Sequence, residues 1–186
     1  MASVLVVCTG NVCRSPIAEG MIRAALAGVP GKDAARVSSA GTMGWEGSPA
    51  MPESVEAAAE RGVDIAGHVA RPLSDEMLEG ADLVVCMARE HRELIEADRP
   101  DLAPRTFTLK ELVRLLEALS GSASDLLARV KEADDLRQSG FAGNPHDEDI
   151  ADPLGLTLDT YRAVAWELDA WCRRLAEGLT GARVEG

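Results

Sequence analysis

The residues with the clearest chemistry lie near the amino terminus, where five residues separate Cys8 from Arg14 and Ser15 follows directly. The apolar run Val4–Val7 before Cys8 indicates a buried strand, and Pro16 opens a segment of good helix formers. A loop between a strand and a helix points its backbone N–H groups and the positive end of the helix dipole at one place. The sequence therefore predicts an anion site with a thiol at its base.

The chemistry of this loop favours a tetrahedral oxyanion. Five residues between Cys8 and Arg14 let N–H donors surround the ion, while the Arg14 guanidinium closes the ring with two hydrogen bonds. The dipoles and Arg14 also favour the thiolate form of Cys8. We expect Ser15 to donate its hydroxyl to the sulfur and Asn11 to adopt a left-handed backbone conformation. The pattern predicts a phosphate, sulfate or arsenate cradle with Cys8 as nucleophile.

Other uses of the loop are disfavoured. A nucleotide-binding loop would carry Gly-Lys-Ser/Thr after Gly10, and this chain does not. The spacing of Cys8 and Cys13 is too long for the usual zinc pair, and neither Cys86 nor Cys172 has a second ligand nearby in the sequence. We therefore expect no metal and no cofactor.

Length and charge restrict the class of protein. We expect residues 1–186 to form a single domain, with a longer polar helical insertion around 119–147. The net charge of −12 disfavours nucleic acid and anionic membranes as partners. No apolar run reaches transmembrane length, no signal peptide is recognisable and the four cysteines suit reduced thiols, so a cytoplasmic location is expected. The oligomeric state is left open.

Strands and helices alternate along the chain, which predicts an α/β fold of three layers: a mostly parallel sheet of about four strands with helices on both faces. The expected strands are 4–8, 36–39, 83–87 and 106–109. The expected helices are 17–27, 52–61, 89–97, one from a capping box at Thr108 and Glu111 through 119, one at 125–137 after a Ser/Gly turn, and a long last helix. Cys8 then lies at a carboxyl strand end, where such sheets bind ligands.

The segment Val7-Cys8-Thr9-Gly10-Asn11-Val12-Cys13-Arg14-Ser15-Pro16 resembles the signature loop of the low-molecular-weight protein tyrosine phosphatase family. The similarity continues in patches to the last helix. This resemblance implies phosphomonoester hydrolysis through a phosphocysteine intermediate on Cys8. It also implies that Arg14 and the loop from Thr9 to Ser15 bind the phosphoryl group, and that the substrate is a phosphorylated protein.

A phosphocysteine mechanism needs an acid that protonates the leaving oxygen. Asp152 precedes Pro153, which restricts it to extended conformations, although Asp-Pro by itself is common turn punctuation. The family carries Asp-Pro in a loop before the last helix, so the resemblance implies that Asp152 is the general acid and later activates water. The acidic residues just before it are expected to be solvated: Asp147, Glu148 and Asp149.

The resemblance also assigns supporting positions. It implies that Ser39 and His68 join Asn11 and Ser15 in a hydrogen-bond network that holds the shape of the loop, as a strained loop requires. The remaining histidines match nothing in the family and are expected to be solvated: His91 and His146.

Substrate specificity is open between phosphotyrosine and phosphoarginine. Many relatives place aromatic residues after Asp-Pro, where this chain has Leu154 and Gly155. Trp45 lies in a glycine-rich segment that resembles the family's second loop, and we expect it and Leu154 to wall the substrate cleft. Some members hydrolyse phosphoarginine, for which a hydroxyl at the position of Val12 would accept a hydrogen bond from the guanidinium. Val12 has no acceptor, which favours phosphotyrosine.

Three further alternatives concern the cysteines. Cys13 is close enough in the loop to trap an oxidised Cys8 as a disulfide, a redox use that the family supports. Arsenate reductases share the fold but need extra cysteines outside the loop, whereas Cys86 is most simply a buried strand residue. A non-catalytic thiol sensor or phosphoprotein-binding module would not need Asp152, so the presence of both residues favours an enzyme.

Overall fold

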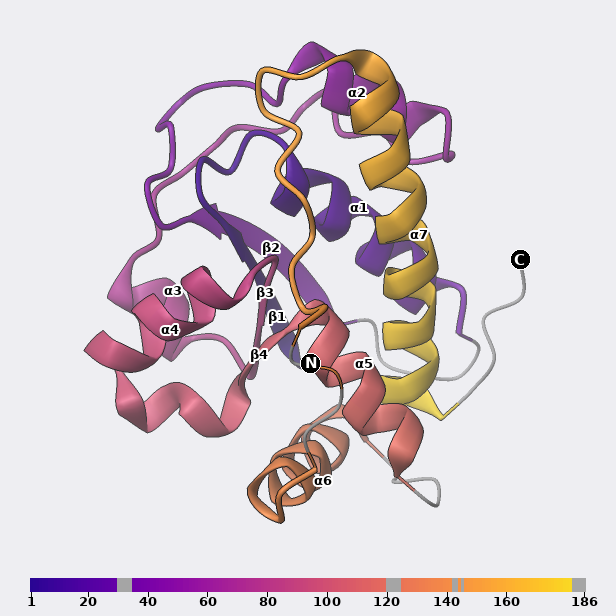
Figure 1. The fold of residues 1–186 in the computed structure, drawn as a ribbon. Coiled ribbons are helices and arrows are strands. Elements are labelled where there is room, and N and C mark those ends of the chain that lie inside the picture. Colours follow the sequence, from indigo (N-terminus) through magenta and orange to yellow (C-terminus); the bar gives the residue numbers. More distant parts are fainter. Residues whose placement is uncertain (30–34, 120–124, 142–143, 145, 182–186) are drawn as a thin grey trace.

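A parallel sheet of four strands separates two layers of helices in the computed structural model (Figure 1). The described residues are 1–29, 35–119, 125–141, 144 and 146–181. The strand order is β2-β1-β3-β4, and all three neighbouring pairs run parallel. The predicted three-layer α/β fold is confirmed.

The elements follow one another along the chain as strands (β), α-helices (α) and one 3₁₀ helix (η1). They are β1 (Ser3–Cys8), α1 (Arg14–Ala27), β2 (Arg36–Gly41), α2 (Pro52–Ala59), α3 (Asp75–Glu79), β3 (Leu83–Cys86), α4 (Arg89–Asp98), η1 (Pro100–Arg105), β4 (Thr106–Thr108), α5 (Leu109–Ala118), α6 (Leu126–Gln138) and α7 (Leu158–Thr180).

The two faces of β1 explain the layers. Side chains alternate across a strand, so Val4 and Val6 face the larger core, whereas Leu5 and Val7 face the smaller one. The larger core is closed by α7, which packs against α1, α2 and α5. The smaller core contains Ile95 of α4 together with residues of α3 and η1. Because β1 is buried on both faces, its apolar run is continuous.

Most boundaries lie within a few residues of the prediction, and the capping box is present, since Thr108 Oγ1 accepts from the N–H of Glu111 (3.2 Å). α1 begins at Arg14, three residues earlier than expected. Two short helices, α3 and η1, escaped prediction because five or six residues show no helical period, and η1 contains two prolines. The Ser/Gly turn expected at 120–124 lies outside the described residues.

Helix α6 docks on the edge strand β4 through Arg137. Its guanidinium donates to the carbonyls of Thr106 (3.0 Å) and Ala103 (2.6 Å) and lies 4.1 Å from the ring centroid of Phe107.

Among the described residues, no helix is long and apolar enough to cross a membrane.

Candidate active site

The loop between β1 and α1 forms the base of the site, with Cys8 as the last residue of β1. Asn11 has a φ of 57° and is the only non-glycine residue in the described part of the chain with a positive φ. This conformation confirms the left-handed turn predicted for Asn11 and bends the loop back over the end of β1.

The environment of Cys8 is defined by its contact with Ser15. The Sγ of Cys8 lies 2.9 Å from the Oγ of Ser15, which also accepts from the Nδ2 of Asn11 at 2.9 Å. The Oδ1 of Asn11 accepts from the backbone N–H of Arg71 (3.0 Å), which fixes the orientation of the amide. Because Ser15 accepts from Asn11, its own proton is available to the sulfur.

The supporting residues expected from the sequence are brought together around Asn11. Its Nδ2 also donates to Ser39 Oγ (2.9 Å), and the Nε2 of His68 donates to its carbonyl oxygen (2.8 Å). Ser39 in turn donates to Glu19 of α1 (2.6 Å). Asn11, Ser15 and Ser39 are buried, so these hydrogen bonds are shielded from water. Their support role stays a prediction, with a geometry that fits it.

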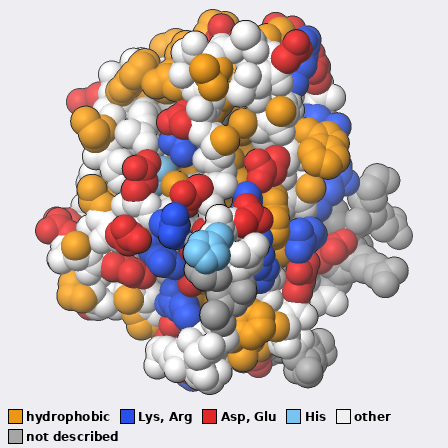
Figure 2. Space-filling model, viewed as in Figure 1, with side chains coloured by type: hydrophobic (Ala, Val, Ile, Leu, Met, Phe, Trp, Pro, Cys, Tyr) orange, Lys and Arg blue, Asp and Glu red, His pale blue; other side chains and the backbone are white. Residues whose placement is uncertain are grey.

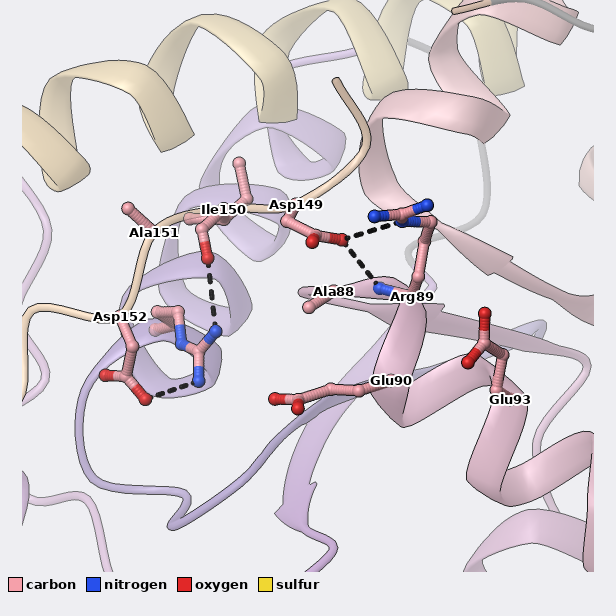
Figure 3. Close-up of a pocket in the computed structure, with 9 residues that line it drawn as sticks. Ala88, Arg89, Glu90, Glu93, Asp149, Ile150, Ala151 and Asp152 are labelled. Atoms are coloured by element: carbon pink, nitrogen blue, oxygen red, sulfur yellow. Dashed lines mark hydrogen bonds and ion pairs between the residues drawn. The ribbon is translucent and has the colours of Figure 1, made fainter. Parts of the chain in front are cut away.

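Arg14 reaches from the start of α1 across the site and is 4% exposed. Its Nη2 donates to Asp152 Oδ2 (2.6 Å) and Thr9 Oγ1 (3.3 Å), and its Nη1 to the carbonyl of Ile150 (3.1 Å). Figure 3 shows Asp152 and Ile150 on one loop, with dashed lines to this guanidinium. The Nε of Arg14 has no hydrogen-bond partner among the described residues. A buried N–H without a partner is costly, so Nε is a donor left for an anion.

A small cavity of about 130 Å³ opens above the loop. Its wall includes both predicted wall residues, Trp45 and Leu154. The residues that line it are Cys8, Thr9, Gly10, Val12, Cys13, Arg14, Met43, Trp45, Asp152 and Leu154. Met43 was missed by the sequence analysis, although it shares the glycine-rich segment of Trp45. Trp45 and Leu154 are 46% and 39% exposed, so both form an accessible rim.

Two glycines allow the Trp45 segment to pack closely, Gly41 against the loop and Gly44 against the backbone of Arg71. A Cβ at Gly41 would lie 2.4 Å from the carbonyl oxygen of Thr9, and one at Gly44 would lie 2.3 Å from that of Arg71. Such distances exclude any side chain. The close approach lets the N–H of Trp45 donate to the carbonyl of Gly10 (3.0 Å).

The acidic run before Asp152 pairs with cations from α4 and α5, and the expectation of solvated charge is wrong for Glu148. Glu148 is buried, while Asp147 and Asp149 are half-exposed but ion-paired. Figure 2 shows basic and acidic side chains intermingled on this face, over α5 and the neighbouring loop. The pairs are Asp147 with Lys110 (2.8 Å) and Arg114 (2.7 Å), Glu148 with Arg92 (3.6 Å), and Asp149 with Arg89 (3.7 Å).

The electrostatics of this run differ from residue to residue. The hydrogen bond from Lys110 lowers the pKa of Asp147. Burial raises the pKa of Glu148, and the nearby Glu111 adds to the effect. Asp149 accepts from the backbone N–H of Arg89 (2.8 Å), which caps the amino terminus of α4. The segment that carries Asp152 is thus fixed residue by residue.

A second cavity, of about 590 Å³, lies between this segment and the start of α4 (Figure 3). Arg14 and Asp152 line both cavities, so their ion pair separates the two. Glu90 extends from α4 toward the Asp152 loop in this view.

His91 is buried, so the expectation that it is solvated is wrong, whereas His146 is exposed as expected. The Nε2 of His91 lies 3.0 Å from Thr9 Oγ1. Burial and the positive charge of Arg14 lower the pKa of His91 to about 4. A signal was available in the sequence: His91 follows the carboxyl end of a buried strand, where side chains of parallel sheets reach a ligand site.

The cysteines are free thiols in the structure. Cys13 is buried with its Sγ 3.6 Å from the hydroxyl of Tyr161, and burial raises the pKa of its thiol. The disulfide between Cys8 and Cys13 stays a prediction. Cys86 is fully buried in β3, as expected. Within the described ranges, no group of three or more His, Cys, Asp or Glu side chains is arranged to hold a metal ion.

Comparisons with known proteins agree with this fold and site. The sequence profile of the family "Low molecular weight phosphotyrosine protein phosphatase" matches residues 3–125. The chain is 32% identical over 176 residues to the protein-arginine-phosphatase of Bacillus subtilis (strain 168), covering 95% of each chain. It is 41% identical over 104 residues to the low molecular weight protein-tyrosine-phosphatase Etp of Escherichia coli (strain K12), covering 56% of this chain and 66% of Etp.

Among solved structures, the low molecular weight protein tyrosine phosphatase of T. tengcongensis superposes with a TM-score of 0.72 and 35% identity, covering 95% of this chain and 99% of that one. The YwlE arginine phosphatase of Geobacillus stearothermophilus gives a TM-score of 0.70 at 31% identity, with 95% and 92% coverage. The chain therefore belongs to the low molecular weight phosphotyrosine protein phosphatase family.

Proposed function

We propose that this protein is a phosphatase that removes phosphoryl groups from proteins through a phosphocysteine intermediate on Cys8. One observation carries the proposal: the sulfur of Cys8, the unpartnered Nε of Arg14 and the carboxyl group of Asp152 all belong to residues that line one small cavity. A nucleophile, an anion donor and an acid are the three groups that this chemistry requires.

The roles follow from the contacts. Cys8 attacks the phosphorus, while Arg14 and the N–H groups of the loop stabilise the charge of the equatorial oxygens. A phosphoryl oxygen that takes Nη2 of Arg14 replaces Asp152, which frees this carboxyl group to protonate the leaving oxygen. Ser15 donates to the sulfur when it departs. Asp152 then activates the water that hydrolyses the phosphocysteine, and the second step restores the free thiolate.

We favour phosphotyrosine as the substrate because the rim of the cavity is apolar. Val12, Met43, Trp45 and Leu154 line it, and Val12 offers no acceptor to a guanidinium. A flat phenyl ring fits such walls, since aromatic contacts bury large apolar area. The aromatic residue that relatives carry after Asp-Pro is absent here, so Trp45 would be the main ring contact.

Phosphoarginine is the second candidate, and the full-length relatives favour it. The protein-arginine-phosphatases of Bacillus subtilis and Geobacillus stearothermophilus match 95% of this chain, at 32% and 33% identity. The carboxylate of Asp152 at the cavity would be the acceptor available to a guanidinium. Arsenate reduction is only the third candidate. It needs extra cysteines outside the loop, whereas Cys86 and Cys172 are fully buried and line no cavity described above.

The test is a comparison of kcat/KM on a phosphotyrosine peptide and a phosphoarginine peptide of the same sequence, with Cys8→Ser as the inactive control. We expect a preference for phosphotyrosine, and Val12→Thr should shift it toward phosphoarginine because it adds a hydroxyl without changing shape. A wild-type preference for phosphoarginine would make the second candidate the function. If the protein hydrolyses neither peptide, the proposal is refuted.

The setting of the enzyme is also a proposal. A cytoplasmic location suits it, because a reducing compartment keeps Cys8 and Cys13 as thiols. Catalysis would be independent of metal, since Arg14 and backbone N–H groups supply the positive charge. Activity should then be unchanged by EDTA.

A further inference from the structure

The side chain of Thr9 has two partners, which makes it a link between two elements. Its Oγ1 accepts from Nη2 of Arg14 (3.3 Å) and is 3.0 Å from Nε2 of His91. An arginine only donates, so one lone pair of the hydroxyl is committed to Arg14. In either tautomer the neutral imidazole uses a second site of the same hydroxyl, and the Thr9 rotamer is fixed by both.

His91 is suited to a fixed contact of this kind. It is 2% exposed, and its Nδ1 has no hydrogen-bond partner among the described residues. Nε2 therefore makes the side-chain hydrogen bond that holds the ring, apart from a contact of 3.4 Å with Glu90. An imidazole that is retained in the interior with one nitrogen unsatisfied costs free energy, which a purely apolar residue of similar size would avoid.

We propose that His91 is a positioning residue for Arg14: through the hydroxyl of Thr9 it holds the guanidinium in the orientation that binds the phosphoryl group. The Ile150 carbonyl and Asp152 hold the other N–H groups of Arg14, but the Asp152 contact is the one that a phosphoryl oxygen would replace. Thr9, held by His91, is the side-chain support of Arg14 that remains when substrate is bound.

The charges around His91 keep its ring neutral, as this role requires. They are Glu90 on its own helix, Arg14 of α1, and Asp149 and Asp152 of the facing loop. Burial and Arg14 outweigh the carboxylates and lower the pKa of His91 to about 4. A protonated ring would place a second positive charge beside Arg14 in a buried site.

The test compares His91→Gln, whose amide reaches the position of Nε2, with His91→Leu, which fills the space without a polar atom. Binding of inorganic phosphate is measured by calorimetry, with thermal unfolding and kcat/KM recorded for each protein. We expect His91→Leu to weaken phosphate binding and lower kcat/KM by about fivefold each, the magnitude of one hydrogen bond. His91→Gln should stay within about twofold of wild type.

A double-mutant cycle shows whether His91 acts through Thr9. Thr9→Val removes the hydroxyl at constant shape and should weaken phosphate binding as much as His91→Leu, and the double variant should be no worse than either. Unchanged phosphate affinity in a folded His91→Leu, or multiplied losses in the double variant, would overturn the proposal. If His91→Leu does not fold, His91→Asn, whose shorter amide does not reach Thr9, replaces it.

This inference rests on the proposed function only for the identity of the anion. Phosphate binding needs no turnover, so a protein that hydrolysed neither phosphopeptide would refute the proposed function and leave the comparison of phosphate affinities to decide the role of His91.

Discussion

The loop from Cys8 to Ser15 and the segment from Asp147 to Asp152 face each other across the site and are held by different forces. Neutral hydrogen bonds centred on the buried Asn11 fix the first. Ion pairs with side chains of α1, α4 and α5 fix the second, and several of these are half-exposed. The nucleophile therefore has a support that is insensitive to salt, whereas the acid is held by contacts that water and ions weaken.

Removing the carboxyl group of Asp152 is expected to have the largest effect, and it tests the separate roles of the two segments. Asp152→Ala should lower kcat/KM by about 10³-fold on phenyl phosphate, whose leaving group needs a proton, and far less on p-nitrophenyl phosphate. Arg14 loses its ion-pair partner but keeps Thr9 and the Ile150 carbonyl, so binding of phosphate should persist. Equal losses on the two substrates would contradict the assignment of Asp152.

His91 lies between the two supports, and its protonation makes the free energy of unfolding depend on pH. The unfolded chain binds a proton on His91 below pH 6.5, whereas the folded protein resists this until about pH 4. The contribution of His91 to the free energy of unfolding therefore falls by up to about 3 kcal/mol as the pH drops through this window, and does not change above it.

His91→Gln removes this proton and should flatten the dependence. Urea unfolding of both proteins at pH 4, 5, 6 and 7 measures it. Parallel stability curves for the two proteins would show that the buried histidine is not the titrating group.

Asn11 is the centre of the hydrogen-bonded support. Asn11→Ala removes one partner each from Ser15, Ser39 and the N–H of Arg71 and disfavours the positive φ, so kcat/KM should fall by roughly 30-fold, or about 2 kcal/mol. Asn11→Gly keeps the φ and separates the two causes. The losses should be the same at low and high salt, and a loss that changes with salt would place Asn11 in the charged half.

Lys110 tests the charged half with the smallest expected effect. Lys110→Met removes the partner of Glu167 and one of the two cations paired with Asp147 but keeps the stem packed, and should lower kcat about threefold at low salt. Wild-type activity should approach that of the variant in about 1 M NaCl, where surface charges are screened. Lys131→Met, on an exposed pair with Asp135 of α6, is the matched control for a general loss of charge.

The contiguous parts of the site could be predicted from the sequence, because one short segment supplies Cys8, Arg14, Ser15 and the turn at Asn11. The glycines around Trp45 also identified a loop that lies close to another backbone. The ion pairs of Asp147 and Glu148 could not be found, since their partners come from α4 and α5 and an acidic run looks the same in sequence whether it is solvated or paired.

The same limit applies to His91 and to the fold. Helical periodicity does not distinguish a buried contact of His91 with Thr9 from a surface position, so its place after the end of β3 was the signal available. Long apolar strands and capped helices were found because their signals are local. The short elements α3 and η1 depend on the packing of the smaller core, which is set by residues distant in the chain.

Arg137 has a consequence beyond holding α6 in place. β4 is a three-residue strand at the end of the sheet, and the unpaired backbone of such a strand can recruit a strand from another molecule. The guanidinium of Arg137 already occupies the carbonyl of Thr106, and its stacking on Phe107 keeps it there. Helix α6 thereby covers part of this sheet edge, since a carbonyl that an added strand would need is already taken.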